Sequence, residues 1–214
     1  MRLLLLASLL MWLCVVAPAE IVDRIAVSVG NQVITESEVV EQIRVAAFLN
    51  RETADFGPEA KRKAAERLVE QTLFKRDMEF AHFAAPGVAE AAGMEEEIRQ
   101  RYASGAEFED GLRHGGLSLE QLRAHLRWQI MLLRFIEYRF APAVQISDDE
   151  IAKYYAGQRA EWERQKRSPV PELAESRAAI EKILTQQRVD QAVDRWLGDT
   201  RSQVEIRYRA EAFR

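Results

Sequence analysis

The chain has 214 residues and a formal net charge of −4 at pH 7, with 48% hydrophobic and 30% charged residues. Nucleic-acid-binding domains are usually basic, so this charge argues against that class of function. The hydrophobic content, together with only ten glycines and six prolines, is typical of a helix-rich globular protein and excludes a chain that is disordered throughout.

The start of the chain has the features of a secretory signal peptide. Arg2 supplies a positive charge, residues 3–16 are uncharged and apolar, and residues 17–19 read Ala-Pro-Ala, which is an A-x-A cleavage site. We therefore predict a signal peptide over residues 1–19, cleavage near Ala19 and export to the periplasm. Retention of the leader as an N-terminal membrane anchor is the alternative.

The single cysteine, Cys14, lies inside this leader. It follows Leu13 rather than the small residue of a lipoprotein site, so we do not expect lipidation. The expected mature chain, residues 20–214, then has no thiol. This excludes disulfide bonds, thiol catalysis and thiolate metal sites, and its stability must come from packing.

A β-hairpin is expected immediately after the leader. Its first strand has apolar residues at odd positions, which indicates one buried face. These residues are Ile21, Ile25, Val27 and Val29. Residues 30–32 (Gly-Asn-Gln) suit a tight turn, and Val33 and Ile34 continue as a second strand.

Three helices are predicted from capping boxes, in which the side chains of a Ser/Thr-x-x-Glu/Gln segment satisfy the first backbone N–H groups. These segments begin at Thr35, Ser118 and Ser147. We expect the first helix to run to about residue 49 and the second to end before Pro142. The second helix has two apolar stripes at three- and four-residue spacing, so it is expected to lie between packing partners.

Further helices are predicted from apolar residues at helical spacing. We expect them over residues 58–82, 88–103 and 107–114. Pro58 suits a first helical turn, and the glycines that follow residue 114 end the last of the three.

The C-terminal part is predicted to contain a linker, a helix and a strand. Residues 158–171 are charged and end in Ser-Pro-Val-Pro, which indicates a linker. A long helix begins at Glu172, and Gly198 is expected to mark its end. Residues 203–208 (Q-V-E-I-R-Y) alternate between apolar and charged side chains, which predicts a half-buried strand.

The two strand-forming ends are expected to pair, because an isolated hairpin is only marginally stable in water. The predicted fold class is mainly α, a helical domain with a small antiparallel β-sheet formed by the N-terminal hairpin and the C-terminal strand. Residues 20–214 would then form a single domain. It would consist of an N-terminal helical module (20–157), the linker, and the C-terminal helix and strand (172–214).

The sequence gives no sign of a metal, nucleotide or catalytic site. His82, His114 and His125 are scattered and match no metal-binding spacing. The acidic runs at residues 95–97 and 148–150 are assigned to first turns of helices, where carboxylates favour the helix dipole. We therefore expect no catalytic residue, no cofactor, no metal and no nucleotide.

Four segments together resemble a known family. They read VDRIAVSVGNQVITESEV after the leader, SLEQLRxHLRxQI and ISDDEIxxYY in the middle, and WLxxxRSQVEI near the end. In this order they resemble the SurA-like periplasmic chaperones, which are relatives of trigger factor and the PrsA foldases. The resemblance implies one chaperone domain, built from an N-terminal helical module and a C-terminal helix and strand, that cradles unfolded outer-membrane proteins.

One part of the family pattern is missing. Typical members carry one or two parvulin-type prolyl isomerase domains between the helix with the Tyr-Tyr pair and the C-terminal helix. Here only the segment between Tyr155 and Pro169 separates the two, which is too short for a domain of at least ~50 residues. We therefore expect a chaperone module that is not an enzyme.

The remaining functional signal is a surplus of aromatic and methionine side chains on the predicted helices. Each of them alone is explained by core packing, but together they predict an apolar groove that binds many unfolded sequences weakly. The candidate client-binding residues are Phe74, Phe80, Phe83, Trp128, Met131, Phe135, Tyr138 and Phe140.

The predicted function is an ATP-independent holdase for unfolded or nascent exported polypeptides, with outer-membrane proteins as candidate clients. A non-catalytic adaptor that grips one periplasmic partner is the alternative, and a residual prolyl isomerase is a third hypothesis. The sequence leaves the oligomeric state and the identity of the clients open.

Overall fold

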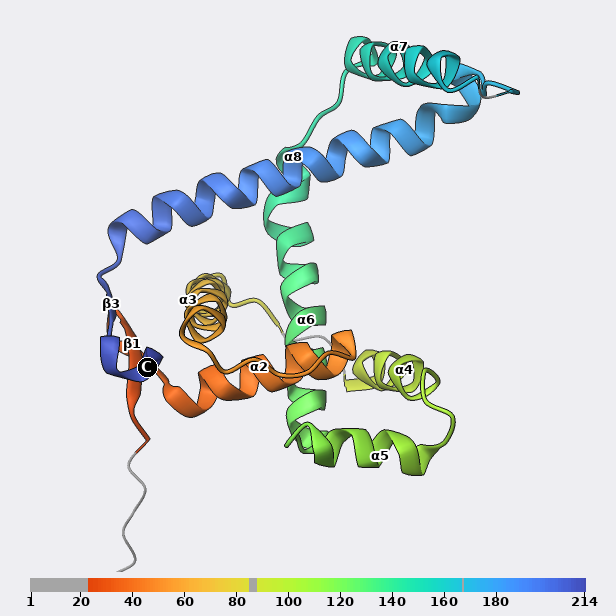
Figure 1. Cartoon of the computed structure of the whole chain (residues 1–214). Coiled ribbons are helices and arrows are strands. Elements are labelled where there is room, and N and C mark those ends of the chain that lie inside the picture. The colour runs from red at the N-terminus through yellow and green to blue at the C-terminus, as the bar shows by residue number, and fades with distance from the viewer. Residues whose placement is uncertain (1–22, 85–87, 167) are drawn as a thin grey trace, which may run out of the picture.

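The computed structural model describes residues 23–84, 88–166 and 168–214. The predicted signal peptide and its cleavage site lie outside the described residues. The fold is mainly α with one small antiparallel sheet, as predicted (Figure 1). Its elements are β1 (Ile25–Val29), β2 (Gln32–Thr35), α2 (Glu36–Asn50), α3 (Pro58–Phe80), α4 (Val88–Arg99), α5 (Gly105–His114), α6 (Leu119–Phe140), the 3-10 turn η2 (Ala141–Ala143), α7 (Asp148–Arg164), α8 (Leu173–Gln203), β3 (Ile206–Tyr208) and the 3-10 turn η3 (Ala210–Phe213).

The sheet joins the two ends of the described chain. Its strand order is β2-β1-β3, and both neighbours are antiparallel to β1. Beyond the ladder itself, the N–H of Gly30 donates to the carbonyl of Glu205 at 2.8 Å, and the N–H of Arg209 donates to that of Ala26 at 2.9 Å. The predicted pairing between the N-terminal hairpin and the C-terminal strand is therefore confirmed.

A β-bulge changes which residues of β1 are buried. Ile25 pairs with Thr35 and Val27 with Ile34, which leaves Ala26 as an extra residue. A bulge of this kind disrupts the alternation of side chains between the faces of the sheet. As a result Ala26 and Val27 are both buried, whereas Ile25 is 44% exposed. The prediction that Ile25 lies on the buried face was wrong.

The first of three cores lies between the sheet, α2 and α3. Val27, Val39 and Val69 are buried here, and Phe213 of η3 packs into the same cluster. The buried ammonium group of Lys61 on α3 donates to the backbone oxygen of Arg214 at 3.0 Å. The C-terminal segment is therefore held by both packing and hydrogen bonds.

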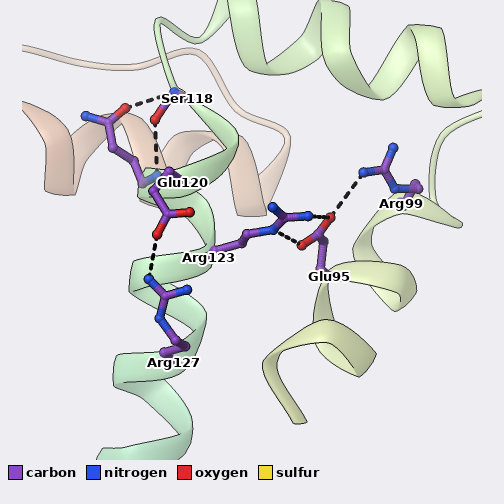
Figure 2. Close-up of polar contacts among 7 residues, drawn as sticks. Glu95, Arg99, Ser118, Glu120, Arg123 and Arg127 are labelled. Carbon is purple, nitrogen blue, oxygen red and sulfur yellow. Dashed lines mark hydrogen bonds and ion pairs between the residues drawn. The ribbon is translucent and has the colours of Figure 1, made fainter. Parts of the chain in front are cut away.

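The second core joins α4 and α5 to α2 and the N-terminal half of α6, with Phe108 and Leu122 fully buried. A polar contact secures α4 against α6 (Figure 2). The carboxylate of Glu95 accepts hydrogen bonds from Arg123 at 2.6 and 3.1 Å and from Arg99 at 3.1 Å. The Arg123 guanidinium, more than any other group, lowers the pKa of Glu95 below its usual value.

The acidic run at residues 95–97 does not occupy a first helical turn, contrary to the prediction. It lies in the second half of α4, which begins at Val88. Glu95 is only 7% exposed, because its side chain is directed at the arginines of α4 and α6 (Figure 2). The run at residues 148–150 does occupy the first turn of α7, as predicted.

The third core forms where the C-terminal half of α6 meets α3 and α8 (Figure 1). The long helix α8 packs its C-terminal half here and its N-terminal half against α7. Two predicted boundaries were wrong. The linker over 158–171 is shorter, because α7 continues to Arg164, and α8 continues past Gly198 to Gln203. A glycine inside a helix costs only about 1 kcal/mol, which packing of the neighbouring Trp196 and Leu197 offsets.

Candidate functional site

Half of the predicted client-binding residues lie inside the third core. Phe74, Trp128, Phe135 and Phe140 are between 0% and 9% exposed. The ring of Trp196 from α8 lies 4.7 Å from that of Phe74. Most of the surface of these four side chains is therefore explained by core packing. Residues of α8 belong to the same core, and sequence periodicity could not show that α8 packs there.

The other predicted residues reach the surface to different extents. Phe80 is 86% exposed and Tyr138 is 59% exposed. Phe83 is partly buried, with its ring centroid 5.3 Å from that of Tyr138. Met131 is also partly buried and packs against the third core. Phe83 also lies 5.2 Å from the ring of Phe135, so it connects the exposed Tyr138 to the core.

A groove formed by three adjoining hollows runs between α2, α3 and α6, and we call it the central groove. The first hollow, about 420 Å³, lies between the three helices. The second, about 170 Å³, shares Gln42, Gln71, His125 and Trp128 with the first. The third, about 370 Å³, shares Glu38, Leu68, Gln71 and Lys75 with the second. Because each hollow shares lining residues with the next, the three lie side by side along the groove.

The apolar part of the groove wall comes from the core. Phe74, Trp128 and Leu132 line the first hollow, so Phe74 and Trp128 form its apolar lining even though most of their surface is buried. The ammonium group of Lys75 lies 5.2 Å from the centroid of the Trp128 ring, within cation–π range. The wall is thus aromatic at Phe74 and Trp128, and charged side chains of both signs, including Lys75, Glu38 and Glu41, lie beside it.

Glutamines contribute to the polar part of the wall, together with charged side chains such as Arg67 and Glu70. Gln42, Gln71 and Gln129 line the groove from α2, α3 and α6 respectively. In the part of the chain that the structure describes, their side-chain amides make no hydrogen bond. An amide offers both donors and an acceptor, so each can bind the backbone of a peptide whatever its side chains are.

One end of the groove reaches the edge of the sheet. Gln32, Val33 and Ile34 of β2 line the third hollow. Among the described residues no strand pairs with the outer edge of β2. An unpaired strand edge is a template for an added strand, and Val33, at 53% exposed, presents an apolar side chain beside it. An extended peptide can therefore begin at β2 and continue between the helices.

A histidine lines the middle of the groove. His125 borders both the first and the second hollow, and burial lowers its pKa. The imidazole is therefore neutral at pH 7, because even its usual pKa of about 6.5 lies below that value. The charged residues that face it across the second hollow are Glu38, Glu41 and Lys75.

The sequence predicted an apolar groove, but it gave no indication of the glutamines that line this one. Single glutamines on three different helices match neither an aromatic cluster nor a catalytic or metal-binding spacing. Within the described residues no group of three or more His, Cys, Asp or Glu side chains is placed to hold a metal ion. Across the same residues no helix is both long and apolar enough to cross a membrane.

No protein-family profile matches the chain, and a search of curated proteins finds no match to its sequence.

Proposed function

We propose that this protein is an ATP-independent chaperone of the periplasm, a holdase that binds extended segments of unfolded exported polypeptides in the central groove. The observation that carries the proposal is the row of adjoining hollows, from the open edge of β2 to the aromatic wall at Trp128. A segment without stable secondary structure fits this shape, because it offers backbone groups along its whole length.

The chemistry of the groove suits many different clients. Backbone hydrogen bonds to β2 and to the free glutamine amides do not depend on client sequence, and the apolar wall accepts hydrophobic side chains of various shapes. Such binding also carries the cost of ordering a flexible segment. The resulting affinity is modest, which allows release without a nucleotide-driven cycle.

The proposed compartment and client class rest on the sequence. The signal-peptide features direct the chain out of the cytoplasm. The four segments that resemble the SurA-like chaperones include the hairpin, the start of α6 and the junction of α8 with β3. The proposal excludes prolyl isomerase activity, and a proline-limited refolding reaction that the protein accelerates would contradict this part of it.

An aggregation assay with a matched pair of variants tests the proposal. Ala46 lines the first hollow, so Ala46→Arg fills the groove with a bulky charged side chain. Ala178 is exposed on α8, and Ala178→Arg is the control because it adds the same side chain to another helix. We expect wild type and Ala178→Arg to suppress aggregation of a chemically unfolded outer-membrane protein, and Ala46→Arg to lose this effect. Aggregation that proceeds unchanged with several-fold molar excess of wild type would contradict the proposal.

The alternative, an adaptor for one folded partner, is favoured by a different observation. Phe80, Leu133 and Tyr138 are exposed at 86%, 66% and 59%, and they lie outside the groove lining. A permanent interface often buries side chains of this kind. Isolation of one partner in a fixed stoichiometric ratio, retained by Ala46→Arg but lost on substitution of Phe80 by serine, would favour the adaptor over the holdase.

A further inference from the structure

A second concave site lies on the other side of α2, between the C-terminal ends of α2 and α5. Its volume is about 600 Å³, within the range of small-ligand sites. We call it the arginine pocket, because Arg44 and Arg51 line it. It shares no lining residue with the three hollows of the central groove.

Neither arginine has a carboxylate partner. Across the described residues no Asp or Glu forms an ion pair with Arg44 or Arg51. By contrast, most arginines on α6 and α8 do have such partners. Arg44 donates one hydrogen bond, from Nη1 to the carbonyl of Gly116 at 3.3 Å. To the other described residues the Arg51 side chain donates no hydrogen bond. A guanidinium has five N–H donors, so most donors of both residues remain free for an anion.

Aromatic rings hold both guanidinium groups in place. The Cζ of Arg51 lies 5.2 Å from the centroid of the Tyr102 ring, and the Cζ of Arg44 lies 5.9 Å from that of Phe56. The Tyr102 ring in turn stacks on Phe48, with centroids 5.9 Å apart. The charged groups therefore sit beside an apolar wall, and a ligand that enters meets both.

Two glycines make room for this arrangement. A Cβ atom at Gly116 would lie 3.2 Å from Cζ of Arg44, and one at Gly111 would lie 3.2 Å from Cε1 of Tyr102. Either contact is tighter than ordinary van der Waals packing. The side chains that define the pocket thus depend on glycine at both positions, since any larger residue would displace the guanidinium or the ring.

Arg51 also has a backbone conformation that favours another residue. It follows the last turn of α2 with φ 59°, in the left-handed region. Glycine or asparagine is preferred there, because a Cβ is strained. Helix stability therefore does not explain an arginine at this position, and its side chain lines the pocket.

The net charge of the lining favours an anion. Two guanidinium groups face a single carboxylate, that of Glu52. His114 also lines the pocket, and its Nδ1 is hydrogen-bonded to the carbonyl of Asp110 at 2.7 Å. The carbonyl groups at the C-terminal ends of α2 and α5 oppose an anion, so the attraction must come from the two guanidinium groups.

We propose that the arginine pocket binds a carboxylate that is carried next to an apolar side chain. The carboxylate pairs with Arg44 and Arg51, and the apolar group packs against Tyr102 and Phe48. In a polypeptide this chemistry occurs at a chain end with an apolar last residue, or where Asp or Glu neighbours an aromatic residue. The site lies outside the central groove, so the proposal does not depend on the chaperone function.

Fluorescence anisotropy of three dye-labelled hexapeptides tests the proposal and separates the two sources of the carboxylate. The first ends in phenylalanine with a free carboxylate, the second is its C-terminal amide, and the third is an amide with glutamate before the phenylalanine. We expect the first peptide to bind at least about tenfold more tightly than the second, the size of one charge-assisted pair. Tight binding of the third shows that a side-chain carboxylate also suffices, and weak binding restricts the site to chain ends.

Two variants show whether binding occurs in this pocket. Arg51→Gly removes the guanidinium and relieves the left-handed backbone, so we expect about tenfold weaker binding of the first peptide without a lower melting temperature. Arg62→Gln is the matched control, because Arg62 also lies 5.2 Å from a tyrosine ring, that of Tyr208, but outside the pocket. It should bind the first peptide as wild type does.

Three outcomes would overturn the proposal. They are equal binding of the first and second peptides, unchanged binding by Arg51→Gly, and an equal loss in Arg51→Gly and Arg62→Gln. Ala46→Arg separates this result from the chaperone proposal, because blockage of the central groove should leave binding of the first peptide unchanged.

Discussion

The sheet end of the molecule and the hairpin of α7 and α8 are held together in different ways. At the sheet end, β1, β3, α2 and α3 enclose a continuous core in which Val27 and Val69 are fully buried. We call α7 with residues 173–188 of α8 the arm. The arm projects away from the sheet (Figure 1), and only Ile151 and Ile180 are buried along it.

The arm depends on contacts that are individually weak. Arg177 pairs with Asp148 and Arg188 with Glu150, and all four side chains are at least 37% exposed. The hydroxyl of Tyr155 donates to the carbonyl of Pro171 at 2.9 Å. Exposed ion pairs contribute about 0–1 kcal/mol each. One helix, α8, therefore belongs to a stable core at one end and to a weakly held hairpin at the other. We expect the arm to open without unfolding of the sheet end.

Removal of the C-terminal strand should have the largest effect. Truncation of residues 203–214 deletes β3 and the buried Phe213, which opens the sheet and exposes the first core. We expect loss of cooperative thermal unfolding in the whole sheet end, including α2, measured by circular dichroism. A melting temperature equal to that of wild type would refute the idea that the two ends of the chain stabilise each other.

Truncation of one buried side chain in the third core and one in the arm should distinguish the stability of these two regions. Phe135 is 0% exposed in the third core, so Phe135→Ala should lower the free energy of unfolding by about 3–5 kcal/mol. Ile180→Ala in the arm should mainly speed hydrogen exchange of α7 and the N-terminal half of α8, with a smaller change in melting temperature. Equal losses in the free energy of global unfolding would show that the arm unfolds together with the third core.

Substitution of Glu95 should have an intermediate, pH-dependent effect. Glu95→Gln removes the charge-assisted hydrogen bonds from Arg99 and Arg123, and we expect a loss of about 1.5–3 kcal/mol at pH 7. Because the folded-state pKa of Glu95 is lowered, the protons it binds on acidification favour the unfolded state. Its contribution is present above the unfolded pKa of about 4.3 and is lost as the pH falls through the folded value.

Urea denaturation at several pH values checks this expectation. Wild type should lose stability more steeply than Glu95→Gln below about pH 4.3. Parallel pH profiles for the two proteins would contradict the role of Glu95 as the ionic link between α4 and α6. Glu97→Gln is the matched control, because Glu97 lies on the same helix and is exposed.

Removal of an arm ion pair should have the smallest effect. Arg177→Ala breaks the pair with Asp148, and we expect less than about 1 kcal/mol of destabilisation, further reduced at 1 M salt. Hydrogen exchange in α7 is the measurement that responds. A loss above about 2 kcal/mol that is insensitive to salt would show that the arm is held more firmly than exposed ion pairs allow.

Several features could be predicted from sequence because they depend on neighbouring residues. The capping boxes at Thr35, Ser118 and Ser147 are all present in the structure, since each requires only side chains three positions apart. The half-buried alternation of Val204, Ile206 and Tyr208 likewise predicted β3. These local signals were enough to predict the fold class and the pairing of the two ends of the chain.

The aromatic candidates show where such prediction stops. Helical spacing placed Phe135 and Tyr138 on one apolar stripe, but it could not show that Phe135 is buried in the third core while Tyr138 stays exposed. Similarly, nothing near Glu95 in the sequence identifies Arg123 as its main partner, which lies on a different helix. These features depend on which distant segment packs against a given face.

By itself the sequence therefore determined the helix starts, the strands and the fold class, because short-range hydrogen bonds and side-chain alternation are encoded within a few residues. The tertiary structure alone decided the central groove and the arginine pocket. Gln42, Gln71 and Gln129 come from three helices, and the pocket joins the ends of α2 and α5. Concave sites of this kind arise only when segments far apart in the chain pack together, because that packing decides which polar groups keep free hydrogen-bonding capacity.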